Sequence, residues 1–287
     1  LASVFGNKVP TEGRDKPPAK YVTTNDGVKI AWDVRGASGP PLMLIHGWSG
    51  SRHYFDRNVE GLSKHFMVYT IDLRFHGDSD KPDHGFHVAR LAADLHNVLQ
   101  SLSLEGVTLL GTSMGCAVIW SYIELFGEAR IAKCVFVDQA PLQYNTPDWK
   151  LGSKGCYDPM RLAALQAVLE CDFEGFARGN ADCCLSKPLP KEMIASLGAE
   201  TLRCSPSALG ALMADHTQLD WRPLLRRITV PCLNLVGRKS GVFPWEGCAE
   251  VGQLVANCQT MFFEDCNHWL YLEEPAKFNK VVASFAG

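Results

Sequence analysis

The sequence predicts an α/β protein built on a doubly wound, mostly parallel sheet, with an all-helical insertion after the sixth strand. Three observations predict this fold. Short apolar segments alternate with segments of helical periodicity along residues 41–137, as in strand–helix–strand units. Several of the apolar segments are continuous rather than alternating, which is typical of strands buried on both faces. Between residues 142 and 227 the strand pattern stops, and it resumes afterwards.

Composition narrows the function classes. The chain has 287 residues, of which 46% are hydrophobic and 21% charged, enough for a large buried core. The net charge is −3 and no basic tract occurs, so nucleic acid and acidic membrane surfaces are not expected as partners. No apolar run approaches the roughly 18 residues that a membrane span needs. We therefore expect a small-molecule substrate as the partner. The composition leaves open whether the chain also forms a homodimer.

The cysteines indicate a compartment. There are eleven, an odd number, and Cys116, Cys134 and Cys232 fall inside apolar runs where a free thiol behaves as a small hydrophobe. We expect reduced thiols and a cytoplasmic location. Neither a Cys-x-x-Cys pair nor a histidine cluster at ligand spacing occurs, and the glycine patterns of dinucleotide and phosphate loops are missing. No metal and no cofactor are therefore predicted.

The first half of the chain supplies most of the sheet. Residues 1–19 read as a loose N-terminal arm, rich in proline and charge. Asn25-Asp26-Gly27 is a turn signal, so residues 21–34 are predicted to form a hairpin. The strands and helices expected next are strands 41–45, 67–71, 107–110 and 131–137 and helices 88–102 and 114–126.

The second half contains the insertion. Its helical patterns cover residues 160–169, 191–197 and 207–216. Strands 229–236 and 260–263 and helices 245–255 and 276–285 then complete the core. The predicted division is an N-terminal arm (1–19), a core (20–141 and 228–287) and a helical lid (142–227). An insertion at the carboxyl ends of the strands covers the place where open α/β sheets bind ligands.

A strand, a sharp turn and a helix meet at Gly111-Thr-Ser113-Met114-Gly115. The two glycines flank Ser113 at two-residue distances, where larger side chains would collide in a strained turn. Ser113 would then stand at a helix N-terminus, whose dipole and free N–H groups favour developing negative charge. A serine in an ordinary glycine-bounded turn is the simpler alternative.

A serine nucleophile needs a base, and the chain offers nine histidines. His268 differs from the others because it follows the last predicted strand, on a loop that should return above the sheet beside Ser113. A histidine at this position serves a structural role about as often as a catalytic one. The late histidine, the elbow serine and His46-Gly47 after the third strand together favour catalysis.

Over nearly its whole length the chain resembles the α/β-hydrolase superfamily. The markers, in the family's order, are His46-Gly47-Trp48, Asp72-Leu-Arg-Phe-His-Gly-Asp-Ser79, the Ser113 elbow and Asn267-His268-Trp269. The resemblance implies Ser113 as nucleophile, His268 as general base and an oxyanion hole from the backbone N–H groups of Trp48 and Met114. It implies a structural role for His46 and for the stretch 74–79, including His76.

The acid departs from the pattern of many relatives, which carry Asp in Gly-x-x-Asp-x-x-x-Pro. Here that position holds Ser240, which cannot stay ionised. The nearest substitute is Asp138, at the end of strand 131–137, and some relatives, including haloalkane dehalogenases and mycotoxin lactonases, are similar in placing their acid there. The order Ser113, Asp138, His268 fits the fold. The alternative is that Asp138 only caps the turn before Pro141.

The nucleophile's identity limits the chemistry. Dehalogenases and epoxide hydrolases use Asp at the elbow. A serine at position 113 excludes their chemistry, so acyl transfer remains as the reaction type. The predicted function is hydrolysis of a carboxylic ester or lactone of a bulky apolar small molecule. The substrate-binding candidates are Trp149, Trp221 and Phe243. Alternatives are a carbon–carbon bond hydrolase or lyase on the same residues, or a ligand-binding receptor with little turnover.

Overall fold

The computed structural model describes residues 19–287. Residues 1–18, most of the predicted arm, lie outside the described part. The sheet strands are β1 (Lys20–Thr23), β2 (Lys29–Arg35), β3 (Pro41–Ile45), β4 (Met67–Ile71), β5 (Val107–Thr112), β6 (Ile131–Val137), β7 (Cys232–Gly237) and β8 (Cys258–Phe263). They form one sheet in the order β1-β2-β4-β3-β5-β6-β7-β8. Only the pairs β1/β2 and β2/β4 are antiparallel, which confirms the predicted mostly parallel sheet.

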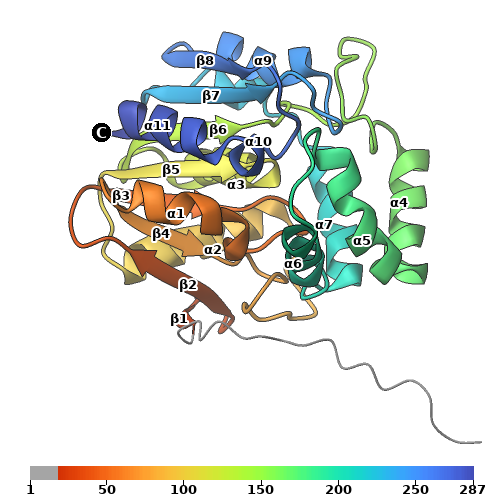
Figure 1. Cartoon of the computed structure of the whole chain (residues 1–287), viewed down its shortest axis with the longest axis horizontal. Helices are drawn as coiled ribbons and strands as arrows, with labels where there is room; N and C mark the ends of the chain where they lie inside the picture. The colour runs from red at the N-terminus through yellow and green to blue at the C-terminus, as the bar shows by residue number, and fades with distance from the viewer. Residues whose placement is uncertain (1–18) are drawn as a thin grey trace, which may run out of the picture.

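Helices cover both faces of the sheet (Figure 1). The core helices are η1 (Arg52–Phe55, a 3₁₀ turn), α1 (Asp56–Leu62), α2 (Val88–Ser101), α3 (Met114–Phe126), α9 (Trp245–Leu254), α10 (Leu270–Glu273) and α11 (Pro275–Ala286). Side chains alternate along β3: Met43 and Ile45 join the core under α2, α3 and α9, whereas Leu42 and Leu44 join the core under α1 and α11. Continuous apolar strands are thus explained by burial on both faces.

Five helices lie between β6 and β7. They are α4 (Pro159–Cys171), α5 (Phe173–Cys184), α6 (Lys191–Thr201), α7 (Pro206–His216) and α8 (Arg222–Leu225). Figure 1 shows α4 to α7 grouped together at one end of the sheet. These helices lie within residues 142–227, the insertion. The connection before α4 also contains one isolated antiparallel bridge, between Thr146 and Trp149.

The structure adds η1, α1, α5, α8 and α10 to the predicted elements, and two of the local differences have simple causes. The sequence does not predict helix α5, because Gly175 and Gly179 weaken its helical pattern. Asp172 compensates at its start, since its side chain accepts a hydrogen bond from Gly175 N at 2.8 Å. Strand β7 begins at Cys232, three residues later than predicted, because Pro231 has no N–H to donate to a neighbouring strand.

All eleven cysteines lie within the described residues, and there they are free thiols. Among the helices of residues 19–287, none combines the length and the apolar character that crossing a membrane requires.

Candidate active site

Ser113 occupies a strained turn between β5 and α3. Its φ is +52° and its ψ is −126°, a region that residues with a side chain rarely adopt. The turn is held by backbone hydrogen bonds, from Ser113 N to Val137 O at 2.9 Å and from Cys116 N to Ser113 O at 2.8 Å. The Ser113 side chain does not cap α3, and it lines a cavity. The strain therefore presents the hydroxyl to the cavity at the N-terminus of a helix.

The two glycines of the motif are required by close backbone contacts. A Cβ atom added at Gly111 would lie 2.5 Å from Gly115 O. A Cβ atom added at Gly115 would lie 2.4 Å from Ile45 O, at the end of β3. Both distances are shorter than any side chain tolerates, so the elbow can form only with glycine at these positions. The contact at Gly111 is a collision within the turn, as the sequence pattern predicts, whereas the contact at Gly115 is with a neighbouring strand.

His268 and Asp138 are brought together from two different loops. His268 Nδ1 lies 2.7 Å from Asp138 Oδ2, within hydrogen-bonding distance. Asp138 is fully buried directly after β6, and His268 follows β8 and is 6% exposed. Gly237 N, at the end of β7, donates to Asp138 Oδ1 at 2.9 Å. Because the parallel strands end at the same edge of the sheet, residues 130 positions apart meet there.

Ser240, where many relatives carry the acid, contacts the same carboxylate. Its hydroxyl donates to Asp138 Oδ2 at 2.7 Å and accepts from Phe243 N at 3.3 Å. The sequence alone predicts no role for Ser240, because a serine cannot stay ionised as the acid must. The signal for this contact is the position of Ser240 in the Gly-x-x-Asp-x-x-x-Pro pattern, three residues after Gly237. The loop that carries this position must pass close to His268 whether the acid follows β6 or β7.

The loop that contains Trp48 runs against Ser113. A Cβ atom added at Gly47 would lie 3.0 Å from Ser113 Cβ and 3.7 Å from Ser113 Oγ. Met114 is the first residue of α3, so its N–H has no acceptor within the helix. The Trp48 N–H donates to no backbone carbonyl oxygen of the described residues. The Trp48 ring is fixed on the insertion, because its Nε1 donates to Leu209 O at 2.9 Å.

Ser113 and His268 line one cavity of about 210 Å³, which the core and the insertion form together. Of the three substrate-binding candidates, Phe243 lines it and lies against the His268 ring, with 5.9 Å between ring centres. Trp149 and Trp221 do not line it. Trp149 is 7% exposed, and its Nε1 donates to Leu142 O at 3.0 Å. Trp221 is 5% exposed and joins the core under α3. Of the three, only Phe243 therefore lies beside Ser113 in this cavity.

His46 and His76 are structural. His46 Nε2 accepts from Leu73 N at 3.0 Å, and His76 Nε2 accepts from Ser49 N at 3.3 Å. The other nitrogen of each ring lies within 2.8 Å of a backbone carbonyl oxygen. Burial lowers the pKa of His46 to about 4 and the pKa of His76 to about 3, so both rings are neutral near pH 7. Each ring joins two loops around the site.

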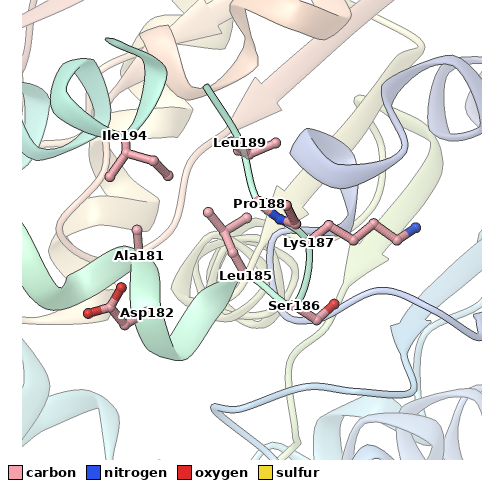
Figure 2. Close-up of a pocket in the computed structure, with 8 residues that line it drawn as sticks. All are labelled: Ala181, Asp182, Leu185, Ser186, Lys187, Pro188, Leu189 and Ile194. Carbon is pink, nitrogen blue, oxygen red and sulfur yellow. The ribbon is translucent and has the colours of Figure 1, made fainter. Parts of the chain in front are cut away.

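A second hollow lies on the insertion itself, between the end of α5 and the start of α6 (Figure 2). Its volume is about 330 Å³. Ala181, Leu185 and Ile194 line it, whereas Ser113 and His268 do not. The Lys187 side chain extends away from Ile194 in Figure 2, and it pairs with Glu274 at 2.5 Å. This hollow is separate from the cavity over Ser113.

Comparisons with known proteins agree with the fold. The chain is 26% identical over 276 residues to a Bacillus subtilis protein of the AB hydrolase superfamily, covering 93% of this chain and 98% of the relative. It is 27% identical to a non-heme chloroperoxidase of Streptomyces lividans, covering 92% and 98%. The solved structure of an esterase from Exiguobacterium antarcticum superposes with a TM-score of 0.89 at 25% identity, covering 94% and 99%. The family described as the alpha/beta hydrolase fold matches residues 40–275, and the chain belongs to this family.

Proposed function

We propose that the protein is a serine hydrolase that cleaves a carboxylic ester or lactone of an apolar small molecule through an acyl-enzyme. The observation that carries this proposal is the 2.7 Å contact between Asp138 and His268 beside a cavity that Ser113 also lines. A nucleophile, a base and an acid that orients the base are the parts that serine acyl transfer needs.

The chemistry follows from the positions of these groups. His268 Nδ1 is held by the Asp138 carboxylate, which leaves Nε2 as the basic nitrogen. Nε2 takes the proton of Ser113 as Oγ attacks the carbonyl carbon, and later gives it to the leaving alcohol. Water then hydrolyses the acyl-enzyme by the same route. His268 bonds to Asp138 but not to Ser113 in the described structure, and a contact between base and nucleophile commonly tightens only when substrate binds.

The oxyanion that forms during attack would be stabilised by two backbone N–H groups. Met114 offers one at the start of α3, where the helix dipole also favours negative charge. Trp48 offers the other, from the loop whose Gly47 lies against Ser113. Removing one such donor typically costs about 10²- to 10³-fold in turnover.

The cavity lining supports an apolar substrate. The side chains around Ser113 include Leu165, Phe176, Met213 and Phe243. Three of these four come from the insertion. We infer that the insertion, residues 142–227, acts as a lid over the cavity. The insertion is held to the core by polar contacts, among them Asn180 Nδ2 to Ser49 Oγ at 3.0 Å. Opening it would admit substrate and closing it would exclude water.

The test uses a fluorophosphonate, which labels serine nucleophiles, and a panel of p-nitrophenyl esters and lactones. The unchanged protein should be labelled once, on Ser113, and should hydrolyse members of the panel. Ser113→Ala should lose both labelling and turnover while keeping its melting temperature. Ser101→Ala, at an exposed position of α2, is the matched control and should behave like the unchanged protein. Labelling that persists in Ser113→Ala would refute the assignment.

The same panel separates the alternatives. A lyase would leave the esters intact and would form no acyl-enzyme detectable by intact mass spectrometry. A receptor-like protein would be labelled once and would then fail to turn over. Steady-state ester hydrolysis with a transient acyl adduct is the result that we expect.

A further inference from the structure

The cavity over Ser113 contains polar side chains to which the proposed mechanism gives no role. Gln143 is 5% exposed and lines the cavity, and its side-chain amide forms no hydrogen bond with any described residue. His216, the last residue of α7, is 2% exposed and also lines the cavity. Neither ring nitrogen of His216 has a hydrogen-bond partner in the described residues. Buried polar groups without partners are uncommon and therefore call for a physical explanation.

These two side chains come from segments that run side by side. Tyr144 N donates to Thr217 O at 3.2 Å, which joins the residue after Gln143 to the residue after His216. Ser153 also lines the cavity and is tied to the first segment, because its N–H donates to Gln143 O at 2.9 Å. Gln143, Ser153 and His216 therefore gather in one region, which we call the polar end of the cavity.

The polar end is uncharged. Burial lowers the pKa of His216 to about 4, so its ring is neutral near pH 7 and offers one N–H donor and one acceptor nitrogen. The Gln143 amide likewise offers both donors and an acceptor. No Lys, Arg, Asp or Glu of the described residues lines the cavity. A carboxylate or phosphate group of a substrate would thus lose its hydration without gaining a cationic partner.

Both ring nitrogens of His216 are shielded from solvent in the described conformation. Rotation by half a turn about the Cβ–Cγ bond exchanges ring nitrogens with ring carbons, and this torsion is roughly two-fold. Water can satisfy such groups in the free protein, but a substrate that displaces the water must replace its hydrogen bonds. A hydrocarbon group placed there would leave buried donors and acceptors unpaired, which disfavours its binding.

We propose that the polar end binds a neutral group of the substrate that both donates and accepts hydrogen bonds, an amide or a hydroxyl, remote from the scissile carbonyl. Gln143 and His216 are then specificity-determining residues that select esters or lactones carrying such a group over purely hydrocarbon ones. The inference rests on the proposed hydrolase function and names the chemical class of its substrate.

The test compares two matched series of p-nitrophenyl esters with acyl chains of three to eight carbons. One series ends in an acetamido group, and the other ends in an isobutyl group with the same number of heavy atoms. The readout is the ratio of kcat/KM for the two esters at each chain length, corrected for their rates of hydroxide hydrolysis. Gln143→Leu and His216→Phe remove the hydrogen-bonding groups with little change in size. Met213→Leu, one turn before His216 on α7, is the control that alters an apolar part of the lining.

At the best chain length we expect the unchanged protein to prefer the acetamido ester by about tenfold, the value of one or two net hydrogen bonds. Gln143→Leu and His216→Phe should each bring the ratio close to one while hydrolysis of the isobutyl series persists. Met213→Leu should change both series alike and keep the ratio. A ratio of one or less at every chain length in the unchanged protein would overturn the inference even if both variants failed to fold.

A preference that survives in both Gln143→Leu and His216→Phe would overturn it equally. Failure of the proposed function looks different: the unchanged protein would then hydrolyse neither series, and Ser113 would not react with the fluorophosphonate. Hydrolysis of both series without preference contradicts only the polar end.

Discussion

Replacing Asp138 by Asn tests the arrangement of the acid most directly. Asp138 Oδ1 accepts from Gly237 N at 2.9 Å, and Oδ2 faces both His268 Nδ1 and Ser240 Oγ at 2.7 Å. The Gly237 N–H is fixed in the backbone at the end of β7, so the Asn oxygen should remain beside it. The Asn NH₂ group then points at His268, whose Nδ1 must become the acceptor. That moves the ring proton to Nε2, where it blocks removal of the Ser113 proton.

The size of the effect follows from that tautomer. In a serine protease the same substitution lowers turnover by about 10⁴-fold with the geometry intact. At about 1.36 kcal/mol per factor of ten, this is roughly 5 kcal/mol of transition-state stabilisation. We expect kcat of Asp138→Asn to fall by about 10³- to 10⁴-fold, with KM little changed. The fold should persist because Asn retains the shape and the Gly237 contact.

The Ser240 side chain provides a graded control and a rescue. Ser240→Ala removes one hydrogen bond to Asp138 Oδ2 but keeps the acid, so kcat should fall by about tenfold or less. Ser240→Asp in the Asp138→Asn background returns a carboxylate close to His268, and we expect part of the activity to return. In the background with Asp138 intact, the same change puts two carboxylates together, which should raise the pKa of one of them.

The assay is steady-state hydrolysis of a p-nitrophenyl ester from pH 6 to 9 under saturating substrate, with thermal unfolding as the check on folding. An Asp138→Asn protein that keeps kcat within tenfold of the unchanged protein would refute the reasoning. Asp138 would then be a turn residue, whose loss costs about 1 kcal/mol of stability.

Two further predictions concern stability. Gly115→Ala should lower the free energy of unfolding by about 1–3 kcal/mol or more, because the added Cβ has no room beside β3. Gly179→Ala in α5 should be neutral or stabilising, because nothing lies within 4 Å of the added Cβ. Urea unfolding measures both. Burial lowers the pKa values of His46, His76 and His216 to about 4, 3 and 4, below the ordinary 6.5, so the unfolded chain binds these protons first. Stability should therefore fall between pH 6 and 4.5, by about 1.4 kcal/mol per pH unit for each histidine, and a flat urea midpoint over this range would contradict it.

Much of the fold and part of the site follow from local sequence. The elbow depends locally on Gly111, since a Cβ there collides with the backbone of Gly115 and Cys116 within the same turn, whereas the collision at Gly115 is with Ile45 of the neighbouring strand β3. The apolar strands determine the parallel sheet, because residues buried on both faces leave no alternation. Parallel strands end at one edge, which is why Asp138 and His268 could be expected to meet although 130 residues separate them.

Tertiary structure decided what depends on the direction in which side chains pack. Trp149 and Trp221 are aromatic residues of the kind that line apolar substrate pockets. The path of the insertion instead places both side chains in hydrophobic cores. Nothing near Gln143 or His216 in the sequence indicates a place beside Ser113, because the backbone contact that joins their segments links residues 144 and 217. Ser240 acquires its partner in the same way, from a carboxylate 102 residues earlier. A local pattern records what a residue can do, whereas its partners depend on how distant segments pack together.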